Sequence, residues 1–440
     1  MYSPSLPLVG PTSAPARRTI RRGAAARSAF VVVLSMVIAG CGILGPAPSA
    51  TGPTASPTTP PDPATVYATI EEEVRAIRGL EENVAVQPGM LDEAALTDYV
   101  KVQFRKNNPP ELVEANERQL KVLGLFPADA SLEDLYIGLL SSQVAGLYNP
   151  KDKKLYVVSR SGALGPAEKS TFAHEYTHAL QDQNFVLDKL NLDATGDGDG
   201  AIARLSLVEG DATLLMSLWQ IDNLTQAEII RLLGESLNPA LTGPIEAMPA
   251  VLRESLLFPY TSGLRFAQRL HAGGGWAAVD AAFAKPPAST EQVIHPEKYE
   301  SDEKPTVVDL PDDLAGRVGA GWSLGLEDTL GEFQLKVWLA NAADGAATEQ
   351  GDATKAAAGW GGDRVAVLYG PGGATAAVID SQWDSPSDAA EFATQAELVV
   401  AALAGEGEVE APAGGTSVRV ILAPSEHVVS RLSMVLGPPG

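Results

Sequence analysis

Residues 166–184 constrain the fold of this chain more than any other stretch, because they place two histidines and a glutamate on one predicted helix. The segment reads Pro-Ala-Glu-Lys-Ser-Thr-Phe-Ala-His-Glu-Tyr-Thr-His-Ala-Leu-Gln-Asp-Gln-Asn. Pro166 suits the first turn of a helix, where its missing N–H has no partner to lose. His174 and His178 are four residues apart, so a helix turns both imidazoles to one side, within reach of a single ion. Glu175 completes a His-Glu-x-x-His pattern.

This pattern indicates a zinc centre. The chain has only five histidines among 440 residues, so composition alone rarely produces such a pattern. A catalytic zinc has three protein ligands, with imidazole nitrogens at about 2.0–2.1 Å, and one position open to water. Glu175 is then placed to accept the proton of that water. The alternative, two surface histidines beside a solvated glutamate, does not account for the spacing. We therefore expect one Zn²⁺ per chain and a third ligand elsewhere.

The third ligand is expected on a second helix, Ala201–Gln220, which is apolar on most sides and therefore predicted to be buried. Glu209 lies in its middle, where a carboxylate costs several kcal/mol unless it binds a metal or a cation. We predict Glu209 as the third zinc ligand, with Asp211 as the second choice. An ion pair with Arg204, or exposure of Glu209 at the Gly210 break, remains the alternative.

Two acidic features near the predicted ligands have alternative interpretations. Asp182 follows His178 by four residues, so it either accepts the other ring N–H of a ligating histidine or is a surface carboxylate at the helix end. Residues 193–200 place three aspartates among glycines, and hard oxygen ligands of this kind bind calcium. The spacing is not that of a full EF-hand loop, so a solvated acidic loop is favoured over a calcium site.

These motifs resemble those of the gluzincin metallopeptidases, which have the thermolysin-like arrangement of ligands. The chain is more similar still to a group of uncharacterised bacterial predicted zinc peptidases, over residues 130–310 and more loosely beyond. The shared segments are Gly146–Pro150, Leu155–Val158, His-Glu-x-x-His-Ala-Leu-Gln-Asp-Gln, Leu-Val-Glu-Gly-Asp-Ala, Phe258–Tyr260 and Ser289–Tyr299. Thermolysin itself has an aspartate four residues after the third ligand, where this chain has Thr213. The surroundings of Glu209 therefore cannot be transferred from it.

The resemblance implies a zinc-dependent endopeptidase that acts on a peptide or protein substrate. His174, His178 and Glu209 would be the zinc ligands, and Glu175 would be the general base. The strand beside the zinc helix would hold an extended substrate through backbone hydrogen bonds, as edge strands do.

His295 is the predicted donor to the oxyanion of such a reaction. It lies outside the zinc motif in a segment bounded by proline, where it could donate a hydrogen bond as a carbonyl is attacked. Tyr260 and Tyr299 compete for that role, and a purely structural histidine is equally compatible with the sequence.

The first 40 residues have the features of an export signal. They contain five arginines and no acidic residue, followed by an apolar run over 29–39 that is too short to span a bilayer. Ile38-Ala39-Gly40-Cys41 resembles a bacterial lipobox, and Cys41 is the only cysteine, which excludes an internal disulfide. We predict a lipoprotein signal peptide over 1–40 and a lipid on Cys41, which would hold the protein at the extracytoplasmic face of the bacterial cell membrane. An ordinary secretory signal is the alternative.

The chain beyond Cys41 begins with a tether and is acidic. Residues 41–66 are rich in Pro, Ser and Thr, a composition that predicts disorder. The full sequence has 32 basic against 55 acidic residues and a net charge of −23. This balance disfavours a nucleic-acid partner.

Hydrophobic periodicity predicts an α+β fold with two domains. Residues 67–311 are expected to form a mostly helical zincin-like domain with a small sheet, and residues 312–440 a small α+β domain of unknown role. In the first domain, helices are predicted over 91–106, 111–123, 132–144, 225–236, 245–257, 263–271 and 277–284, with a break at 273–275, and a hairpin over 145–148 and 155–158. In the second, strands are predicted over 365–369, 376–379 and 417–422, and helices over 325–339 and 387–403.

Together these features predict a lipid-anchored extracytoplasmic zinc-dependent endopeptidase. The alternative from another class is a non-enzymatic envelope lipoprotein with a vestigial or structural zinc site, which acts by binding. A peptide-hydrolysis assay distinguishes these two hypotheses, whereas metal analysis does not, because both predict bound metal.

Overall fold

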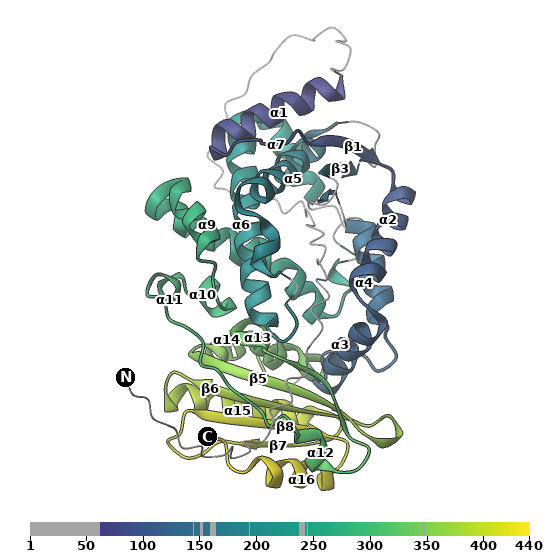
Figure 1. Cartoon of the computed structure of the whole chain (residues 1–440), viewed down its shortest axis with the longest axis vertical. Coiled ribbons are helices and arrows are strands. Elements are labelled where there is room, and N and C mark those ends of the chain that lie inside the picture. Colours follow the sequence, from purple (N-terminus) through teal and green to yellow (C-terminus); the bar gives the residue numbers. More distant parts are fainter. Residues whose placement is uncertain are drawn as a thin grey trace, which may run out of the picture.

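The computed structural model describes residues 62–143, 145–149, 153–158, 164–192, 194–236, 243, 245–345 and 348–440. The predicted signal peptide, Cys41 and nearly all of the tether lie outside these residues. Within the described part of the chain, no helix is both long and apolar enough to cross a membrane. Figure 1 shows an upper, mostly helical part standing on a lower part that is built around a larger sheet.

Two long helices, α5 (Pro166–Phe185) and α6 (Gly198–Asn223), form the centre of the upper part (Figure 1). The helices around them are α1 (Pro63–Arg78), α2 (Glu93–Asn107), α3 (Pro110–Val122), α4 (Leu132–Gln143), α7 (Gln226–Ser236), α9 (Ala250–Ala284), α10 (Thr290–Ile294) and α11 (Pro296–Glu300), with a 3-10 turn at Leu187–Leu190. The predicted zinc helix is therefore present, and it packs between α1, α6 and the small sheet.

The small sheet has the strand order β1–β3–β2 and stands beside α5. Strand β1 (Gln87–Leu91) is parallel and β2 (Gly146–Asn149) antiparallel to β3 (Lys154–Val158), so the predicted hairpin is confirmed. Strand β2 packs so closely on α5 that a Cβ on Gly146 would overlap Thr171 and lie 3.0 Å from Glu175 Cγ. Glycine thus allows an edge strand to approach the zinc motif.

Helix α9 replaces the three separate helices predicted between residues 245 and 284. It runs through Pro259 and departs from helical geometry only at 274–275, where a break was predicted. Its first part crosses α6 so closely that a Cβ on Gly210 would overlap the carbonyl of Gly263. This packing outweighs the local signal of the proline, which disfavours a helix interior when no tertiary contact compensates.

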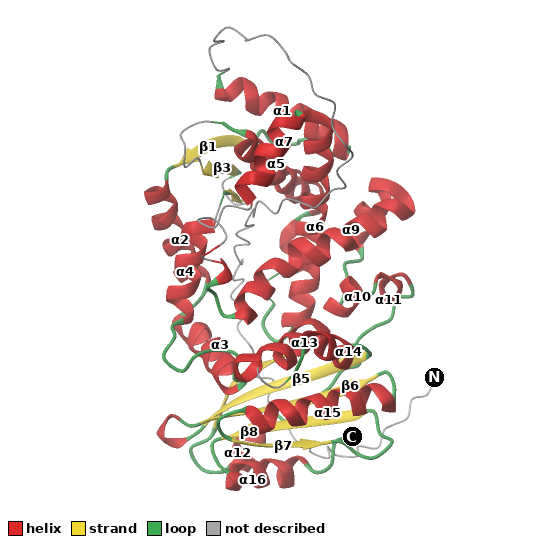
Figure 2. Ribbon diagram, turned by 180° about the vertical axis from the view of Figure 1, so that it is seen from behind, coloured by secondary structure: helices red, strands yellow, loops and turns green. Residues whose placement is uncertain are grey.

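The lower part contains a five-stranded antiparallel sheet with the order β4–β5–β6–β8–β7. Its strands are β4 (Ser323–Asp328), β5 (Trp360–Tyr369), β6 (Thr375–Trp383), β7 (Glu406–Glu410) and β8 (Ser417–Ala423). Its helices are α12 (Leu314–Val318), α13 (Gly331–Asn341), α14 (Gln350–Ala357), α15 (Pro386–Ala402) and α16 (Glu426–Leu436), with 3-10 turns at Ala342–Gly345 and Pro371–Gly373. Figure 2 shows α15 lying along the sheet.

Alternation along the strands buries both faces of this sheet. Ile379 packs in a core with α13, α14 and α15, while its neighbour Val378 packs with α12 and α16 on the other face. The three strands and the helix predicted over 387–403 are confirmed. The helix predicted over 325–339 is wrong in its first half, because β4 pairs there with β5 as an edge strand. Asp363 fixes the turn that follows by accepting the N–H groups of residues 330 and 331.

Helix α13 joins the two parts of the molecule. Its Phe333 packs in the upper core with Phe258 of α9, whereas its Trp338 packs in the core of the lower sheet. Leu123, just after α3, also belongs to the lower core, and its carbonyl accepts Trp338 Nε1 at 3.1 Å. The predicted α+β class is confirmed, but the boundary predicted after residue 311 does not separate two independent cores.

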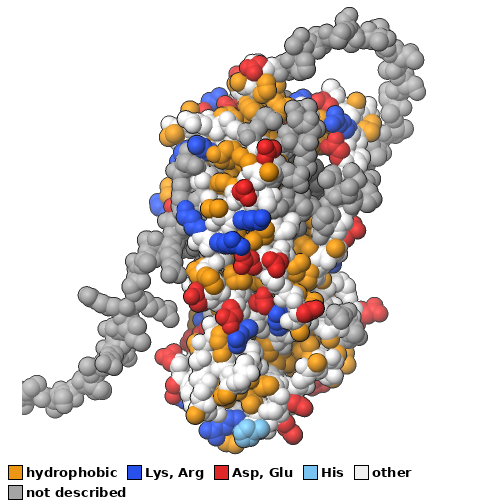
Figure 3. Space-filling model, turned by 90° about the vertical axis from the view of Figure 1, so that its right-hand side faces the viewer, with side chains coloured by type: hydrophobic (Ala, Val, Ile, Leu, Met, Phe, Trp, Pro, Cys, Tyr) orange, Lys and Arg blue, Asp and Glu red, His pale blue; other side chains and the backbone are white. Residues whose placement is uncertain are grey.

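Figure 3 shows one face of the molecule. Basic and acidic side chains are interspersed over the described residues of this face, with hydrophobic side chains between them. This distribution is typical of a surface with scattered ion pairs, which contribute little to stability individually.

Candidate metal centre

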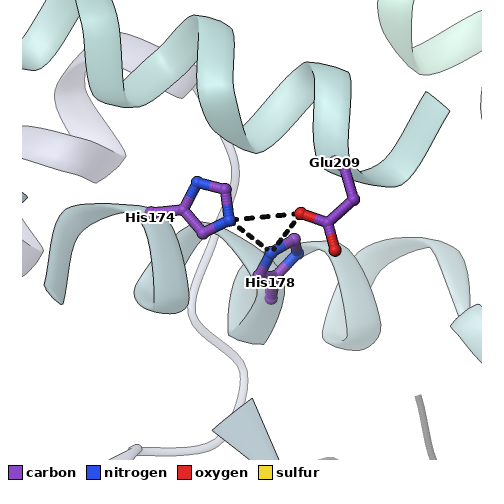
Figure 4. Close-up of side chains that lie close together, drawn as sticks. All are labelled: His174, His178 and Glu209. Carbon is purple, nitrogen blue, oxygen red and sulfur yellow. Dashed lines mark hydrogen bonds and ion pairs between the residues drawn. The ribbon is translucent and has the colours of Figure 1, made fainter. Parts of the chain in front are cut away.

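Helix α5 presents its zinc motif on the side that faces α6. Pro166 starts the helix, and the Glu168 carboxylate accepts the Gly165 N–H at 2.9 Å, which satisfies a backbone donor before the first turn. On another side, Phe172 stacks on Tyr67 of α1, with ring centroids 4.3 Å apart. This packing fixes the rotation of the helix and turns both motif histidines toward α6 (Figure 4).

His174, His178 and Glu209 converge on one point between α5 and α6 (Figure 4). His174 Nε2 lies 2.9 Å from His178 Nε2, and Glu209 Oε2 lies 3.3 Å from the first and 3.5 Å from the second. Each of the three residues is at most 1% exposed. Glu209 thus lies where a third ligand was predicted, while the second choice, Asp211, forms an ion pair with Arg78 instead.

The three converging atoms fit a zinc ion. Ligand atoms at about 2.0–2.2 Å from one tetrahedral zinc lie roughly 3.3 Å from each other, and the observed separations are 2.9, 3.3 and 3.5 Å. Two imidazoles and a glutamate are also the ligand set of one class of catalytic zinc sites. Glu209 Oε2 is buried and accepts no hydrogen bond among the described residues. Its neighbours are the two imidazole nitrogens at 3.3 and 3.5 Å, and a metal ion bound between them would also neutralise this carboxylate.

The pKa shifts at this point differ between the two histidines. Burial lowers the pKa of His174 below its ordinary value, so the ring is neutral near pH 7 and has a lone pair for a metal. Burial alone would raise the pKa of Glu209, but the neighbouring imidazoles, His178 first, bring it below its ordinary value. The neutral His174 ring therefore faces an ionised carboxylate. Burial alone would lower the pKa of His178, but the same Glu209 carboxylate raises it above its ordinary value.

The prediction that Asp182 accepts the second ring N–H of a ligating histidine is wrong. Gln181 is the residue that faces His178 Nδ1, with its Oε1 at 2.8 Å. Asp182 instead accepts hydrogen bonds from Lys153 Nζ at 2.6 Å and from the Tyr148 hydroxyl at 3.0 Å, both on the hairpin of the small sheet. Both candidates lie within one turn of His178, and the cation on the hairpin draws Asp182 to the other side.

Gln181 belongs to a buried polar chain that the sequence analysis missed. Its Nε2 donates to Asp211 Oδ2 at 2.8 Å and to the Val208 carbonyl at 3.0 Å. Asp211 pairs with Arg78 Nε of α1 at 2.9 Å, and Arg78 also pairs with Asp280 of α9 at 2.7 Å. The only sequence signal for this chain is the presence of polar residues on otherwise buried helices, and it does not show which residues meet.

Glu175 and Tyr260 lie next to the converging ligands. Glu175 is fully buried where α5 meets β2. The ring of Tyr260, on α9, lies 6.2 Å from the ring of His174. The other predicted tyrosine, Tyr299, donates its hydroxyl to the Lys285 carbonyl at 2.8 Å. Of the two tyrosines, Tyr260 is therefore the one placed beside the centre.

The prediction of His295 as an oxyanion donor is wrong in this structure. Its Nε2 lies 3.0 Å from Glu332 Oε1 at the junction with the lower part, and this hydrogen bond raises the pKa of His295. The segment of His295 docks at the start of α6, where the Thr290 N–H donates to Asp199. Asp199 precedes Glu209 by ten residues on the same helix, or about 15 Å along its axis.

The acidic loop over 193–200 does not gather calcium ligands among the described residues. Asp193 lies outside them. Asp197 pairs with Arg204 at 2.9 Å, and Asp199 accepts the hydrogen bonds at the base of α10 described above. Arg204 is thus engaged by the loop, so it is not the partner of the third ligand.

A second group of carboxylates surrounds Lys298 at the junction of the two parts, and we call it the Lys298 cluster. The Lys298 Nζ lies 2.6 Å from Glu291, 2.8 Å from Glu303 and 2.6 Å from Asp384. The ammonium group occupies the position that a metal ion would take, so the chain itself supplies the cation that these three carboxylates share.

The comparisons with known proteins concern the lower part of the molecule. Residues 323–432 match a family described as "Domain of unknown function (DUF8575)", a span that runs from β4 into α16. No curated protein and no solved structure was found to match the chain. The chemistry of the metal centre is therefore inferred from its own residues and geometry.

Proposed function

We propose that this chain is a zinc-dependent endopeptidase. The observation that carries the proposal is the buried convergence of His174, His178 and Glu209 (Figure 4), with Glu175 directly after the first of them in the sequence. When bound, zinc supplies a Lewis acid for a peptide carbonyl and lowers the pKa of water at the site. The resemblance of the motifs to those of gluzincin metallopeptidases supports the same function.

The residues around the ligands have separate roles in this proposal. Glu175 accepts the proton of the water molecule that attacks the scissile carbonyl, and it returns that proton to the departing amine nitrogen. Tyr260, whose ring lies beside His174, donates a hydrogen bond to the carbonyl oxygen as negative charge develops on it. Tyr260 replaces His295 in this role.

Strand β2 is the proposed support for the substrate backbone. It lies at the edge of the small sheet and packs on α5 next to Glu175. An extended peptide that pairs with an edge strand gains backbone hydrogen bonds and presents alternate side chains to pockets. Pairing at β2 would align the peptide along the helix that holds the general base.

We place the protein at the extracytoplasmic face of the cell membrane, anchored by a lipid on Cys41. This part of the proposal rests on the sequence, since Cys41 lies outside the described residues. Cys41→Ala is expected to release the protein from the membrane fraction or to block its processing. Lipid-labelled, membrane-bound Cys41→Ala protein would contradict the anchor.

Glu175→Gln tests the proposed activity. Glu175 is not a proposed ligand, so the variant should keep its zinc and its fold but lose hydrolysis by roughly 10²- to 10⁴-fold, the usual range for a general base. Glu168→Gln is the matched control, because glutamine at this position can still accept the Gly165 N–H. The measurement is a peptide-library digest with zinc-loaded proteins, beside metal analysis. Equal cleavage by Glu175→Gln would assign the activity to another site.

A non-enzymatic envelope lipoprotein with a structural zinc site is the second candidate. The near-complete burial of the ligands and of Glu175, each at most 1% exposed, favours it, because structural zinc sites are closed to substrate. Bound zinc together with inertness toward all peptides and unfolded proteins offered would support this candidate.

A further inference from the structure

We propose that Gln181 sets the tautomer of His178, and that Asp211 and Arg78 hold the Gln181 amide in the orientation this requires. The inference deepens the proposed metal centre and rests on it. It assigns a role to three buried polar residues that take no part in the proposed reaction. Gln181 and Asp211 are both 0% exposed, and Arg78 is 1% exposed.

The partners of Gln181 determine which end of its amide faces the histidine. Its nitrogen is surrounded by acceptors, the Val208 carbonyl at 3.0 Å and Asp211 Oδ2 at 2.8 Å. The reversed amide would place its oxygen against both of these oxygens and lose two hydrogen bonds. The Gln181 oxygen therefore faces His178 Nδ1, at 2.8 Å.

An amide oxygen accepts hydrogen bonds and cannot donate them, so Nδ1 of His178 must carry the proton. In a neutral imidazole the other nitrogen is then an acceptor. That nitrogen, Nε2, is the atom 3.5 Å from Glu209 Oε2 and 2.9 Å from His174 Nε2. Gln181 thus presents the lone pair of His178 to the point where the three ligands converge.

Arg78 keeps Asp211 in its acceptor role. Its Nε lies 2.9 Å from Asp211 Oδ1, and its second terminal nitrogen lies 3.2 Å from Asp211 Oδ2. Arginine stays charged inside proteins, so the paired carboxylate stays an acceptor for the amide. Asp280, at 2.7 Å, and the ring of Trp276, 4.6 Å from the guanidinium carbon, hold Arg78 in place. The chain of contacts therefore starts on α1 and ends at a metal ligand on α5.

The two histidines differ in whether Nδ1 has a hydrogen-bond partner. Nδ1 of His174 is buried and has no hydrogen-bond partner among the described residues, whereas Nδ1 of His178 has Gln181. Groups that bind the far nitrogen of a ligating histidine fix its orientation, and their loss typically weakens metal binding by about 10- to 100-fold. We therefore expect metal binding at His178 to weaken when Gln181 is lost.

The test compares Gln181→Met with Gln183→Met in the full chain. Methionine keeps the length of the side chain but cannot hold the histidine N–H or donate to Asp211. Gln183 lies on the same helix and accepts the N–H groups of residues 83 and 84, so it controls for the substitution itself. Gln181→Met should bind zinc about 10- to 100-fold more weakly than wild type, and Gln183→Met should bind it equally well.

A second measurement reads the tautomer directly and needs no metal. In metal-free protein labelled with ¹⁵N-histidine, at a pH high enough to leave the His178 ring neutral, its ring shifts, assigned by their loss in His178→Ala, should show a proton on Nδ1 and none on Nε2 in wild type and in Gln183→Met. Gln181→Met should lose this fixed tautomer. A merely structural Gln181 would leave the His178 shifts and the zinc affinity unchanged, and that result would overturn the inference.

The double variant Gln181→Glu, Asp211→Asn keeps the test decisive if Gln181→Met does not fold. It exchanges the amide and the carboxylate, so the histidine N–H still meets an acceptor while position 211 donates to it. The neutral His178 ring should still carry its proton on Nδ1, because a carboxylate at position 181 accepts it, and loss of this tautomer would overturn the inference. The tautomer is the readout for this variant, since a carboxylate oxygen at position 181 also faces the Val208 carbonyl. If wild type binds no zinc, the proposed metal centre fails, and the tautomer of His178 in the metal-free protein still decides whether Gln181 sets it.

Discussion

Among the described residues, two places gather three side chains of the kind that bind metals: the candidate metal centre between α5 and α6, and the Lys298 cluster at the junction. In the Lys298 cluster an ammonium group lies 2.6–2.8 Å from all three carboxylates. In the candidate metal centre no lysine or arginine of the described residues forms an ion pair with Glu209, and its Oε2 faces the two imidazoles at 3.3 and 3.5 Å. The comparison shows that convergence alone does not indicate a metal. What matters is whether the chain supplies its own cation.

Exposure separates the two places further. The side chains of Glu303 and Asp384 are 46% and 42% exposed, so water solvates much of their charge. Glu209 is 1% exposed and depends on a partner inside the protein, because a buried charge without one is strongly unfavourable.

The largest expected difference between the two places is in zinc affinity. Four-ligand zinc sites bind with about 10–16 kcal/mol in total, so removal of one ligand in His178→Ala should cost about 3–4 kcal/mol, or roughly 10²- to 10³-fold in Kd. Glu303→Ala removes a carboxylate from the Lys298 cluster and should leave zinc binding unchanged. Zinc competition titrations on both variants measure this, and equal losses would remove the distinction between the two places.

A smaller effect is expected from pH at the Lys298 cluster. Burial, together with Glu332 and Asp384, raises the pKa of Glu291 to about 7 although Lys298 opposes the shift. The native state therefore keeps a proton that the unfolded chain releases near its ordinary pKa of 4.5. Between about pH 4.5 and 7 the native protein binds more protons than the unfolded chain. The stability that Glu291 contributes is therefore full below about pH 4.5 and is lost as pH rises through about 7.

Glu291→Gln should remove this pH dependence. The shift corresponds to about 2–3 kcal/mol, so the stability of wild type relative to the variant should fall by that amount between pH 4.5 and 7.5. Urea unfolding at both pH values gives the difference. Parallel behaviour of the two proteins would mean that Glu291 is ionised throughout.

The smallest expected effect tests whether Lys298 replaces a metal. Lys298→Met leaves three carboxylates without their cation, and oxygen ligands of this kind bind Ca²⁺ with Kd near about 1 mM when partly exposed. At about 10 mM Ca²⁺ the variant should gain about 1.4 kcal/mol of stability, while wild type gains none. Lys336→Met, which removes a lysine paired with the single carboxylate of Glu254, is the control. Calcium stabilisation of wild type to the same extent would contradict the role of Lys298.

Local hydrophobic periodicity correctly predicted those helices and strands whose conformation depends mainly on their own residues. Patterns of 3.6 or 2 residues predicted helix α5, the hairpin before it, three strands of the lower sheet and the long helix α15. The prediction was wrong where distant contacts outweigh these patterns. Residues 323–328 pair with β5 as an edge strand, and Pro259 continues a helix because α9 packs tightly on α6.

The candidate site divides in the same way. His174, Glu175 and His178 follow from spacing on one helix, and Glu209 follows from the cost of a carboxylate in an apolar helix. Gln181 could not be distinguished from Asp182, because both lie within a turn of His178 and the choice depends on Lys153 and Asp211, which come from other elements.

The sequence by itself therefore determined which helix holds the histidines and which buried carboxylate needs a partner, since both are properties of local spacing and of residue chemistry. Only the tertiary structure decided what surrounds them. Contacts across more than 100 residues, such as Arg78 with Asp211, depend on how helices rotate and cross. Contacts of this long-range kind also place His295 at the junction and Tyr260 beside His174. The docking of whole elements sets the position of such side chains, because the local sequence pattern does not determine it.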